Sequence, residues 1–279
     1  MLRQIVEKIF RTKQKQTNIK VTIIGSCLSN FVVTDYLANC LDNTEIVRLT
    51  SALQLRSDIV LEIIENDSFD YDLVNSFLSC GQWGGCKEKQ DYAKWFSSFV
   101  MDKVDNCRNI AMDIPDLLIM DSLCDIRHSL YAHKEKGWKA FFGNIQFKDP
   151  EVSRQFNEKF QYIGLLDPQT QLDNIVRIYN FFRKKSPKVI LCYMHFPMHP
   201  NYLDSKWIQR SLEFKALFDE YSKGGKIAQC EIISLPEDRI KPVTDPDDPN
   251  YSPQIWNHFY PEVYQFFSEK ISDKIALCR

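Results

Sequence analysis

Residues 21–37 read VTIIGSCLSNFVVTDYL. An apolar run ends at Gly25, small polar residues follow, and the apolar positions then take a helical spacing. This order predicts a buried strand over residues 20–25, a tight turn, and a helix over residues 30–41. A strand that passes through a glycine turn into a helix is typical of the first unit of an α/β fold.

Further apolar runs along the chain extend this pattern. Short segments rich in valine, isoleucine and leucine occur at 45–49, 116–121, 188–194 and 230–235. They are continuous rather than alternating with polar residues, as in parallel strands covered on both faces. Segments of helical period lie between and around them at 52–65, 68–78, 91–106, 168–185, 204–223 and 258–276. We therefore expect an α/β fold with a doubly wound, mainly parallel five-stranded sheet flanked by helices.

The domain organisation is expected to be simple. No linker or repeat divides the chain, so residues 1–279 are predicted to form a single α/β domain with a helical insertion at 66–113 and a mixed one at 122–166. Residues 1–18 are predicted to form an N-terminal amphipathic helix that packs on the domain. Weak contact of the basic stretch 1–15 with a membrane surface is the alternative.

The composition excludes several protein classes. A formal net charge of −2 disfavours a nucleic-acid partner. The nine cysteines are odd in number and scattered, which favours a reducing, cytoplasmic location over a disulfide framework. No apolar run reaches the roughly 18 residues of a transmembrane helix, and the N-terminus does not resemble a signal peptide. Nothing in the sequence indicates the oligomeric state.

The Gly25-Ser26-Cys27 turn is the strongest candidate for a functional site. Ligands of open α/β sheets bind at the carboxyl ends of the strands. At a helix start, backbone N–H groups stabilise a thiolate or hold an oxyanion, so Ser26, Cys27 and Ser29 are candidate nucleophiles or ligands. The alternative is a tight turn in which Ser26 or Ser29 caps the helix.

Histidines supply the candidate base. His258, in PQIWNHFYPEVYQFF, comes at the start of the last predicted helix and is the expected partner of a nucleophile in the first turn; a capping or surface role is the alternative. His195 follows the fourth strand and is expected to line the crevice. His199 lies near His195, but Pro197 prevents a helical pair, so we expect no metal there.

Two other clusters have weaker patterns. Asp121, Asp125 and Arg127 follow the third strand and are expected either to bind substrate or to form an ion pair. Cys80 and Cys86 lack the spacing and the second pair of a zinc site, so the GQWGG segment between them is interpreted as a flexible loop.

Together these segments resemble the SGNH/GDSL hydrolase superfamily. They are more closely similar to its divergent GSC-x-S branch, which is associated with bacterial surface-polysaccharide biosynthesis. The motifs that carry the resemblance are VTIIGSCLSN at 21–30, SALQLRSDI at 51–59, IPDLLIMDSLCDIR at 114–127 and WNHFYPEVYQFF at 256–267.

The resemblance implies roles for individual residues. The superfamily's Gly-Asp-Ser block places Cys27 at the nucleophile position, and its late Asp-x-x-His block places His258 as the base. Ile255 stands where that block has aspartate, so an orienting carboxylate would come from Asp247 or Asp248. The oxyanion asparagine has no clear counterpart.

The remaining site residues are expected from their positions at the carboxyl ends of the strands, and the resemblance implies the activity. Gly25, Ser29, Asn30, Asp121, Arg127 and His195 are expected to form the oxyanion or substrate-binding part, although Asn30 replaces the arginine of this branch. A thiolate exchanges acyl groups readily with thioesters. The expected function is therefore a cytoplasmic acyltransferase with acyl-CoA as co-substrate and no tightly bound cofactor, acting on a sugar or sugar-nucleotide of a capsule or surface polysaccharide. The alternatives are a carbohydrate esterase or deacetylase that uses Ser26 or Cys27, and a non-catalytic glycan-binding relative.

Overall fold

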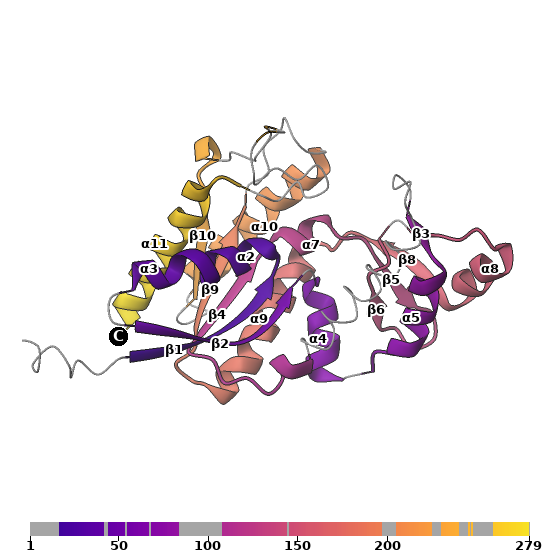
Figure 1. The fold of residues 1–279 in the computed structure, drawn as a ribbon, viewed down its shortest axis with the longest axis horizontal. Coiled ribbons are helices and arrows are strands. Elements are labelled where there is room, and N and C mark those ends of the chain that lie inside the picture. Colours follow the sequence, from indigo (N-terminus) through magenta and orange to yellow (C-terminus); the bar gives the residue numbers. More distant parts are fainter. Residues whose placement is uncertain are drawn as a thin grey trace, which may run out of the picture.

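A five-stranded parallel sheet forms the centre of the molecule (Figure 1). The computed structural model describes residues 17–41, 44–53, 55–66, 68–83, 108–143, 145–196, 205–224, 230–239, 245, 247 and 259–278. The strand order is β10-β9-β4-β1-β2. The strands are β1 (Thr17–Gly25), β2 (Thr44–Leu53), β4 (Leu117–Asp121), β9 (Ile190–His195) and β10 (Cys230–Ser234). The predicted α/β fold and all five predicted strands are confirmed.

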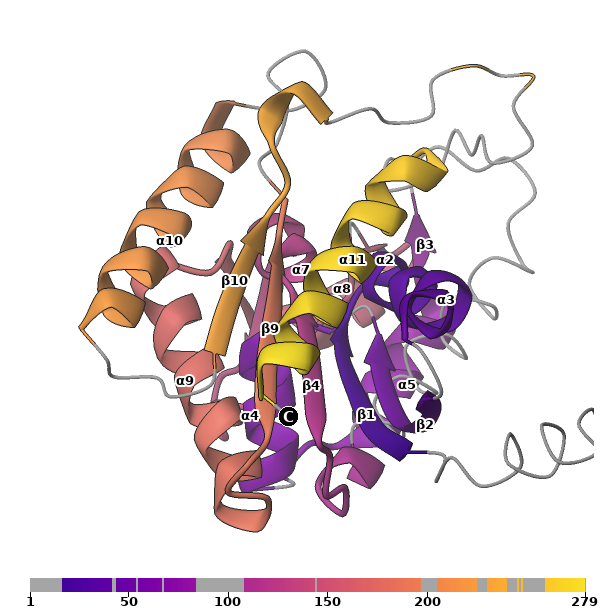
Figure 2. The ribbon, with the colours of Figure 1, turned by 90° about the vertical axis from the view of Figure 1, so that its left-hand side faces the viewer.

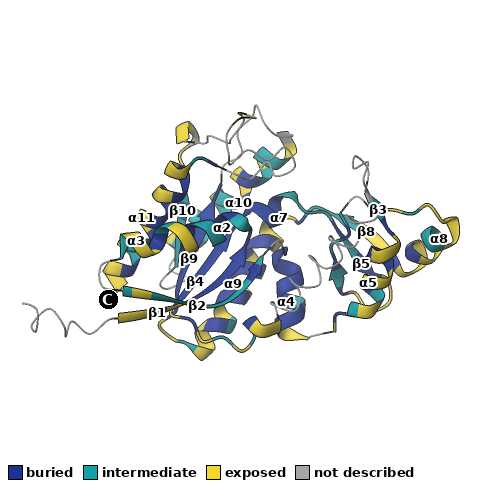
Figure 3. Cartoon of the chain, viewed as in Figure 1, coloured by how far each residue is buried: buried dark blue, intermediate teal, exposed yellow. Residues whose placement is uncertain are grey.

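Helices cover both faces of the sheet (Figure 2). One face carries α2 (Cys27–Phe31), η2 (Val32–Leu37), α3 (Ala38–Cys40) and α11 (Pro261–Cys278). The other face carries α4 (Ser57–Glu65), α9 (Pro168–Lys185) and α10 (Ser205–Lys223). Every residue of β4 and β9 is buried, because each of these strands packs on two helical layers (Figure 3).

Side chains of β1 alternate between the two layers of core. Val21 and Ile23 pack with the α2 and α11 layer, whereas Ile24 packs with the α4 and α9 layer. Such alternation follows from the period of two along a strand. The continuous apolar run of β1 is therefore needed, because both faces of the strand are buried.

Acidic residues define the starts of several helices. Asp167 accepts a hydrogen bond from Thr170 N at 3.0 Å, and Pro168 occupies the first turn of α9. Asp70 caps α5 (Tyr71–Cys80) in the same way. An aspartate cap followed by proline is a local signal, which explains why the bounds of α9 agree with the predicted helix.

The two insertions build small sheets beside the main one (Figure 1). The chain after α7 (Leu123–Arg127) forms a three-stranded antiparallel sheet in the order β6-β5-β8, and β3 pairs with β7. Helix α8 lies between β7 and β8, and a short 3-10 helix, η3, follows β10. Their bounds are β3 (Gln82–Trp83), β5 (Leu130–His133), β6 (Lys139–Ala140), β7 (Ile145–Gln146), α8 (Pro150–Lys159), β8 (Phe160–Gly164) and η3 (Glu237–Arg239). Aromatic rings fill the space between this part and α5: Phe77, Phe142, Phe156 and Phe160.

Several predicted boundaries need correction. Residues 17 and 18 belong to β1 rather than to an N-terminal helix, and residues 1–16 lie outside the described residues. Strand β2 is longer than predicted, so α4 begins at Ser57 instead of residue 52. The predicted helix over 91–106 also lies outside the described residues, as does Cys86. Within the GQWGG segment, which was predicted to be a flexible loop, Gln82–Trp83 form strand β3 and pair with β7.

Candidate functional site

The candidate site lies at the carboxyl edge of the sheet, where β1 and β4 end side by side. Ile24 pairs with Met120, so the turn after β1 meets the residues after β4. The chain enters α2 directly after Ser26, whose extended φ and ψ of −108° and −178° mark the N-cap. The strand pairing thus brings together two segments that the sequence separates by about a hundred residues.

Ser26 stabilises this turn through its hydrogen bonds. Its hydroxyl donates to Asp121 Oδ2 at 2.8 Å and accepts from Leu28 N at 3.2 Å, and its own N–H donates to Asp121 Oδ2 at 2.6 Å. The side chain has no solvent exposure. The structure therefore gives Ser26 the N-cap role, which was the structural alternative, and removes it from the candidate nucleophiles.

Asp121 organises the turn rather than binding a substrate. Its Oδ2 also accepts a hydrogen bond from Ser29 Oγ, and its Oδ1 accepts one from Leu123 N at 3.0 Å. Asp121 and Ser29 are both buried. A buried carboxylate needs several donors, and these four bonds supply them. The expected substrate contacts of Asp121 and Ser29 are thus replaced by support of the turn.

Gly25 is required because the Asp121 carboxylate approaches the backbone so closely. A Cβ on residue 25 would overlap Asp121 Oδ2 and Ser29 Oγ and lie 2.8 Å from Asp121 Cγ. The φ of Gly25 is not positive, so space and not backbone conformation selects glycine here. Gly25 thus allows the carboxylate to reach the Ser26 amide.

Cys27 remains as the nucleophile candidate of the turn. It is the first residue of α2 and is partly exposed, in contrast to the buried serines on either side. The backbone N–H groups of a helix start favour a negative charge on such a side chain. Cys27 thus combines access from outside with an environment that suits a thiolate.

Arg127, in the last turn of α7, adds a positive charge to this environment. Burial lowers the pKa of Arg127, whereas the thiolates of Cys124 and Cys27 act in the opposite direction. Its guanidinium carbon lies 5.3 Å from the centre of the Trp207 ring. Because the interaction between two charges is mutual, Arg127 favours the thiolate form of Cys27.

Cys124 lies beside the turn but is a poor nucleophile. It is buried, and its Sγ donates to the carbonyl oxygen of Gly25 at 3.8 Å. Burial, followed by the charges of Asp121 and Asp125, raises the pKa of its thiol well above the ordinary value. Cys124 thus stays protonated, which distinguishes it from Cys27.

Asn30 offers a polar atom at the rim of the turn. It is half-buried, and its backbone N–H closes the first turn of α2 on Ser26 O at 3.4 Å. Within the part of the chain that the structure describes, its buried Oδ1 has no hydrogen-bond partner. An unpaired buried acceptor is costly, so Asn30 keeps its place as a candidate substrate contact.

His195 is a structural histidine, which corrects the expectation that it lines the crevice. It has no solvent exposure. Its Nδ1 lies 2.9 Å from Ser234 Oγ, and its Nε2 lies 2.9 Å from Ser211 Oγ. Burial lowers the pKa of His195 to about 4. The neutral ring joins β9, β10 and α10, and both of its nitrogens are occupied.

His258 lies outside the described residues, as do His199 and Ile255. The residue after it, Phe259, is described and buried. The Phe259 ring stacks on Phe196 at the end of β9 with centroids 5.5 Å apart, and its N–H donates to Tyr264 Oη at 3.0 Å. The chain thus reaches residue 259 at the same edge of the sheet as Cys27.

Helix α11 packs against the helical stretch 27–40 on the same face of the sheet (Figure 2). Tyr264 packs on Phe31 with ring centroids 5.7 Å apart, Ser268 Oγ donates to Val32 O at 3.3 Å, and Ser272 Oγ donates to Cys40 O at 2.9 Å. The contacts advance in the same direction along both elements. These contacts hold α11 against the helical stretch that begins at Cys27.

Sequence reasoning missed a buried polar network behind the turn. Arg56 donates to both carboxylate oxygens of Asp58 at 2.9 and 2.6 Å, and also to His128 O and Gly164 O. Ser57 N donates to Asp125 Oδ1 at 2.6 Å. The sequence signal that could have indicated this network is the Arg56-Ser57-Asp58 run at the start of α4.

Asp125 and Arg127 do not share one role. Asp125 is buried against the start of α4, and burial raises its pKa to about 7. Arg127 points to the opposite side of α7, toward Cys27 and Trp207. Asp125 therefore belongs to the supporting network and Arg127 to the candidate site.

Comparisons with known proteins give only distant likenesses. No protein-family model matches the chain, and a search of curated proteins finds no match. Among solved structures, the chain is similar to a GDSL-like lipase from Bacteroides thetaiotaomicron, with 11% identity, a TM-score of 0.46, and coverage of 100% of this chain and 98% of the other. An acylhydrolase structure from Bacteroides fragilis, described as putative, has 12% identity, a TM-score of 0.43, and coverage of 96% and 90%. A carbohydrate esterase family 2 enzyme with a carbohydrate-binding domain, from Corynascus thermopiles, has 13% identity, a TM-score of 0.44, and coverage of 93% and 66%.

All three TM-scores lie below 0.5, so the site is interpreted from the residues of this chain alone. None of the described helices has the length and apolar character that crossing a bilayer requires.

Proposed function

We propose that the protein is an acyl-transferring enzyme with Cys27 as its nucleophile. One observation carries the proposal: the hydroxyls of Ser26 and Ser29 are buried and bonded to Asp121, while the Cys27 side chain between them is partly exposed and near Arg127. A thiolate rather than an alkoxide is therefore the nucleophile that this turn supports.

The proposed reaction has two steps. The Cys27 thiolate attacks the carbonyl carbon of an acyl thioester, and the donor leaves as a thiolate when its carbon–sulfur bond breaks. A hydroxyl of the acceptor then attacks the acyl-enzyme, gives its proton to a base, and releases the Cys27 thiolate. Backbone N–H groups at the start of α2 support the oxyanion in both steps.

His258 is the proposed base for the second step. Its support is the position of Phe259, the next residue in the chain, at the sheet edge that carries Cys27. The proposed donor is acyl-CoA, since a thioester and an acyl-cysteine have similar energies. A sugar or sugar-nucleotide of a surface polysaccharide is the proposed acceptor, which rests on the resemblance of the motifs.

Incubation with acetyl-CoA tests the nucleophile. We expect an added acetyl group in the intact mass, located at Cys27 by peptide mapping and removed by hydroxylamine. Cys27→Ala should reduce CoA release more than about 1000-fold, as removal of a nucleophile commonly does. Cys80→Ala, which removes an exposed cysteine, is the matched control and should leave the acetylation unchanged.

A chromogenic acetyl ester separates the other functions. Rapid hydrolysis of this ester without turnover of acetyl-CoA would identify an esterase instead of a transferase. Acetylation of Ser26 in place of Cys27 would contradict the proposed nucleophile. A protein that processes neither compound, and whose biological activity survives both Cys27→Ala and His258→Ala, would be the non-catalytic relative.

A further inference from the structure

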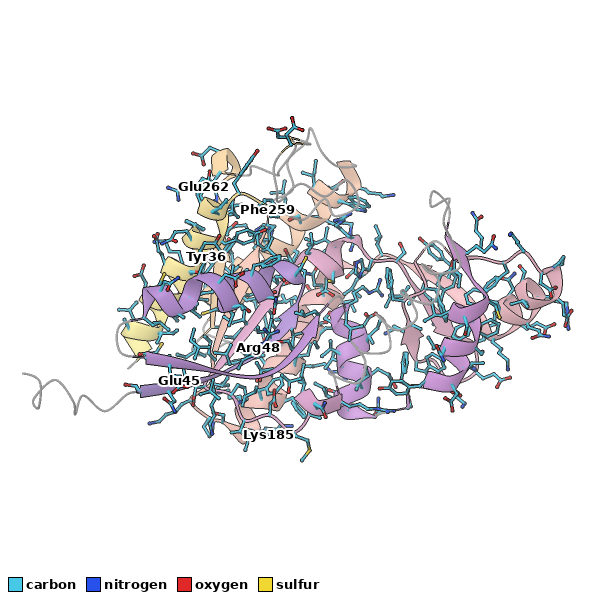
Figure 4. All side chains as sticks on the ribbon, in the orientation of Figure 1. Tyr36, Glu45, Arg48, Lys185, Phe259 and Glu262 are labelled. Carbon is cyan, nitrogen blue, oxygen red and sulfur yellow. The ribbon has the colours of Figure 1, made fainter. Side chains whose placement is uncertain are left out.

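The last turns of α9 border a cavity at the end of the sheet opposite to Cys27. After α9 the chain enters β9 at Ile190, so these turns lie at the amino ends of the parallel strands. Cys27, in contrast, follows the carboxyl end of β1. A strand of five residues, such as β4, separates the two ends by roughly 17 Å. Figure 4 accordingly shows Lys185 at the lower edge of the molecule and Phe259 near the upper edge.

This hollow, the α9 cavity, has a volume of about 590 Å³. A volume between roughly 300 and 1,000 Å³ is usual for a small-molecule site. The cavity is lined by Glu65, Arg177, Asn180, Phe181, Arg183 and Lys184. Positions 177, 180, 181 and 184 are three or four residues apart, so they share one face of the helix. Glu65 is the last residue of α4, and the cavity therefore lies where the end of α4 meets α9.

Positive charge dominates the α9 cavity. Two guanidinium groups and one ammonium group line it, against a single carboxylate. That carboxylate belongs to Glu65 and forms an ion pair with Arg177. Arg183 and Lys184 are exposed, and no carboxylate in the described part of the chain forms an ion pair with either of them. Their charges are therefore left for an anionic ligand.

Phe181 gives the α9 cavity an aromatic wall. Its side chain is half-buried, whereas Asn180 and the basic residues on this face are exposed. The Lys185 ammonium nitrogen lies 4.3 Å from the centre of the Phe181 ring, and it also donates a hydrogen bond to Ala111 O. Because Lys185 does not line the cavity, we place it on the far side of the ring. A planar group inside the cavity can then stack on Phe181.

The basic residues of α9 also have a structural explanation. Cations in the last turn of a helix interact favourably with its terminal carbonyl groups, and three basic residues occupy positions 183–185. Lys223 takes the equivalent place in α10 and does not line the α9 cavity. The explanation does not account for Phe181, nor for Arg177, which lies two turns before the end of α9. Cations and an aromatic ring around one cavity instead fit a nucleotide.

We propose that the α9 cavity binds a nucleoside diphosphate. Arg183 and Lys184 contact the phosphates, and Phe181 stacks on the base. The cavity lies at the other end of the sheet from Cys27, so this inference goes beyond the proposed acyl transfer and does not depend on it.

Calorimetric titration of the full chain with ADP and with UDP tests the inference. We expect saturable binding, with lower affinity for pyrophosphate, which lacks the base, and for adenosine, which lacks the phosphates. Arg183→Gln and Lys184→Gln should each weaken binding about tenfold, as expected when one hydrogen bond to a charged group is lost. Phe181→Leu should weaken it about fivefold and leave the affinity for pyrophosphate unchanged.

Two further variants give the test a sign and a control. Glu65→Gln removes the carboxylate from the cavity and releases Arg177, so it should strengthen binding about threefold. Lys223→Gln is the matched control, because it removes the same charge from the end of another helix, and it should leave the affinity unchanged. The side chains of Arg183, Lys184 and Lys223 are exposed, so these variants keep the fold.

Three results would overturn the inference. The first is an absence of binding of both ADP and UDP at about 1 mM. The second is pyrophosphate binding as tight as that of the nucleotides, which would give Phe181 no part in recognition. The third is an equal effect of Lys184→Gln and Lys223→Gln, which would place the nucleotide outside the α9 cavity. None of these measurements uses acyl transfer, so failure of the proposed function is distinguishable from failure of this inference.

Discussion

Ser26 and Cys27 are neighbours in the chain, yet their surroundings give them different chemistry. The Ser26 hydroxyl donates to a buried carboxylate and caps a helix, so it has no free proton and no access to a substrate. The Cys27 side chain is partly exposed to solvent and interacts electrostatically with the guanidinium of Arg127. One step along the backbone therefore separates a buried capping residue from the proposed nucleophile.

Replacement of Gly25 tests whether the turn leaves room for a Cβ at residue 25. Gly25→Ala places a Cβ against Asp121 Oδ2 and Ser29 Oγ, so the carboxylate has to move away from the Ser26 amide. We expect a loss of about 1–3 kcal/mol in the free energy of unfolding, measured with urea, together with slower alkylation of Cys27. Gly224→Ala, at an exposed turn after α10, is the control. Equal effects of the two changes would contradict the steric account.

At the scale of elements, the start of α4 is held by a buried ion pair. Arg56 and Asp58 are both almost fully buried, and Arg56 also bonds to carbonyl oxygens after α7 and at the end of β8. The pair therefore joins the main sheet to the small antiparallel one. Breaking such a pair leaves an uncompensated buried charge.

The variant Asp58→Ala should consequently be strongly destabilised. We expect a loss of about 3–5 kcal/mol in the free energy of unfolding, because the Arg56 guanidinium would keep its burial without its carboxylate. Arg154→Ala on α8, whose ion pairs with Glu151 and Glu158 are exposed, is the comparison and should change stability little. Similar urea midpoints for the two variants would show that burial does not set the strength of this pair.

The helices and strands also show which features of the fold can be predicted from the sequence alone. Strands buried on both faces are continuous apolar runs, so β1, β4 and β9 could be found from composition. The two small antiparallel sheets were not predicted, because strands of two residues such as β6 and β7 have no periodicity. In the site, the turn and Cys27 could be located, but the bond between Ser26 and Asp121 joins residues 95 positions apart and leaves no local pattern. His195 was misplaced, because the position after a strand does not show on which side of the sheet a side chain lies.

For the whole molecule, two buried groups act oppositely on stability as pH changes. The pKa of Asp125 is raised to about 7, so its ionisation costs stability as pH rises from about 4 to about 7. The pKa of His195 is lowered to about 4, so the cost of keeping it neutral disappears as pH rises from about 4 to about 6.5. The two effects partly cancel in the wild-type protein.

The substitution Asp125→Asn separates the effect of Asp125 on stability from that of His195. Asp125→Asn removes one titration, so its stability relative to wild type should increase between pH 4 and pH 8, by about 4 kcal/mol for a shift of about three pKa units. Urea unfolding across this range measures the difference. Asp247→Asn, at an exposed position, is the control and should follow the wild-type profile. A difference between Asp125→Asn and wild type that is constant with pH would contradict the raised pKa.

The contact of α11 with the stretch 27–40 also determines when the surroundings of Cys27 can form. Ser268 and Val32 are 236 residues apart, so one wall of the site is made early in translation and the other near its end. Contacts of such long sequence separation are slow to close and leave apolar surface exposed in the meantime. While the chain is still on the ribosome, β1 and α2 have no final helix to cover them. A nascent chain would therefore complete the surroundings of Cys27 only after α11 leaves the exit tunnel.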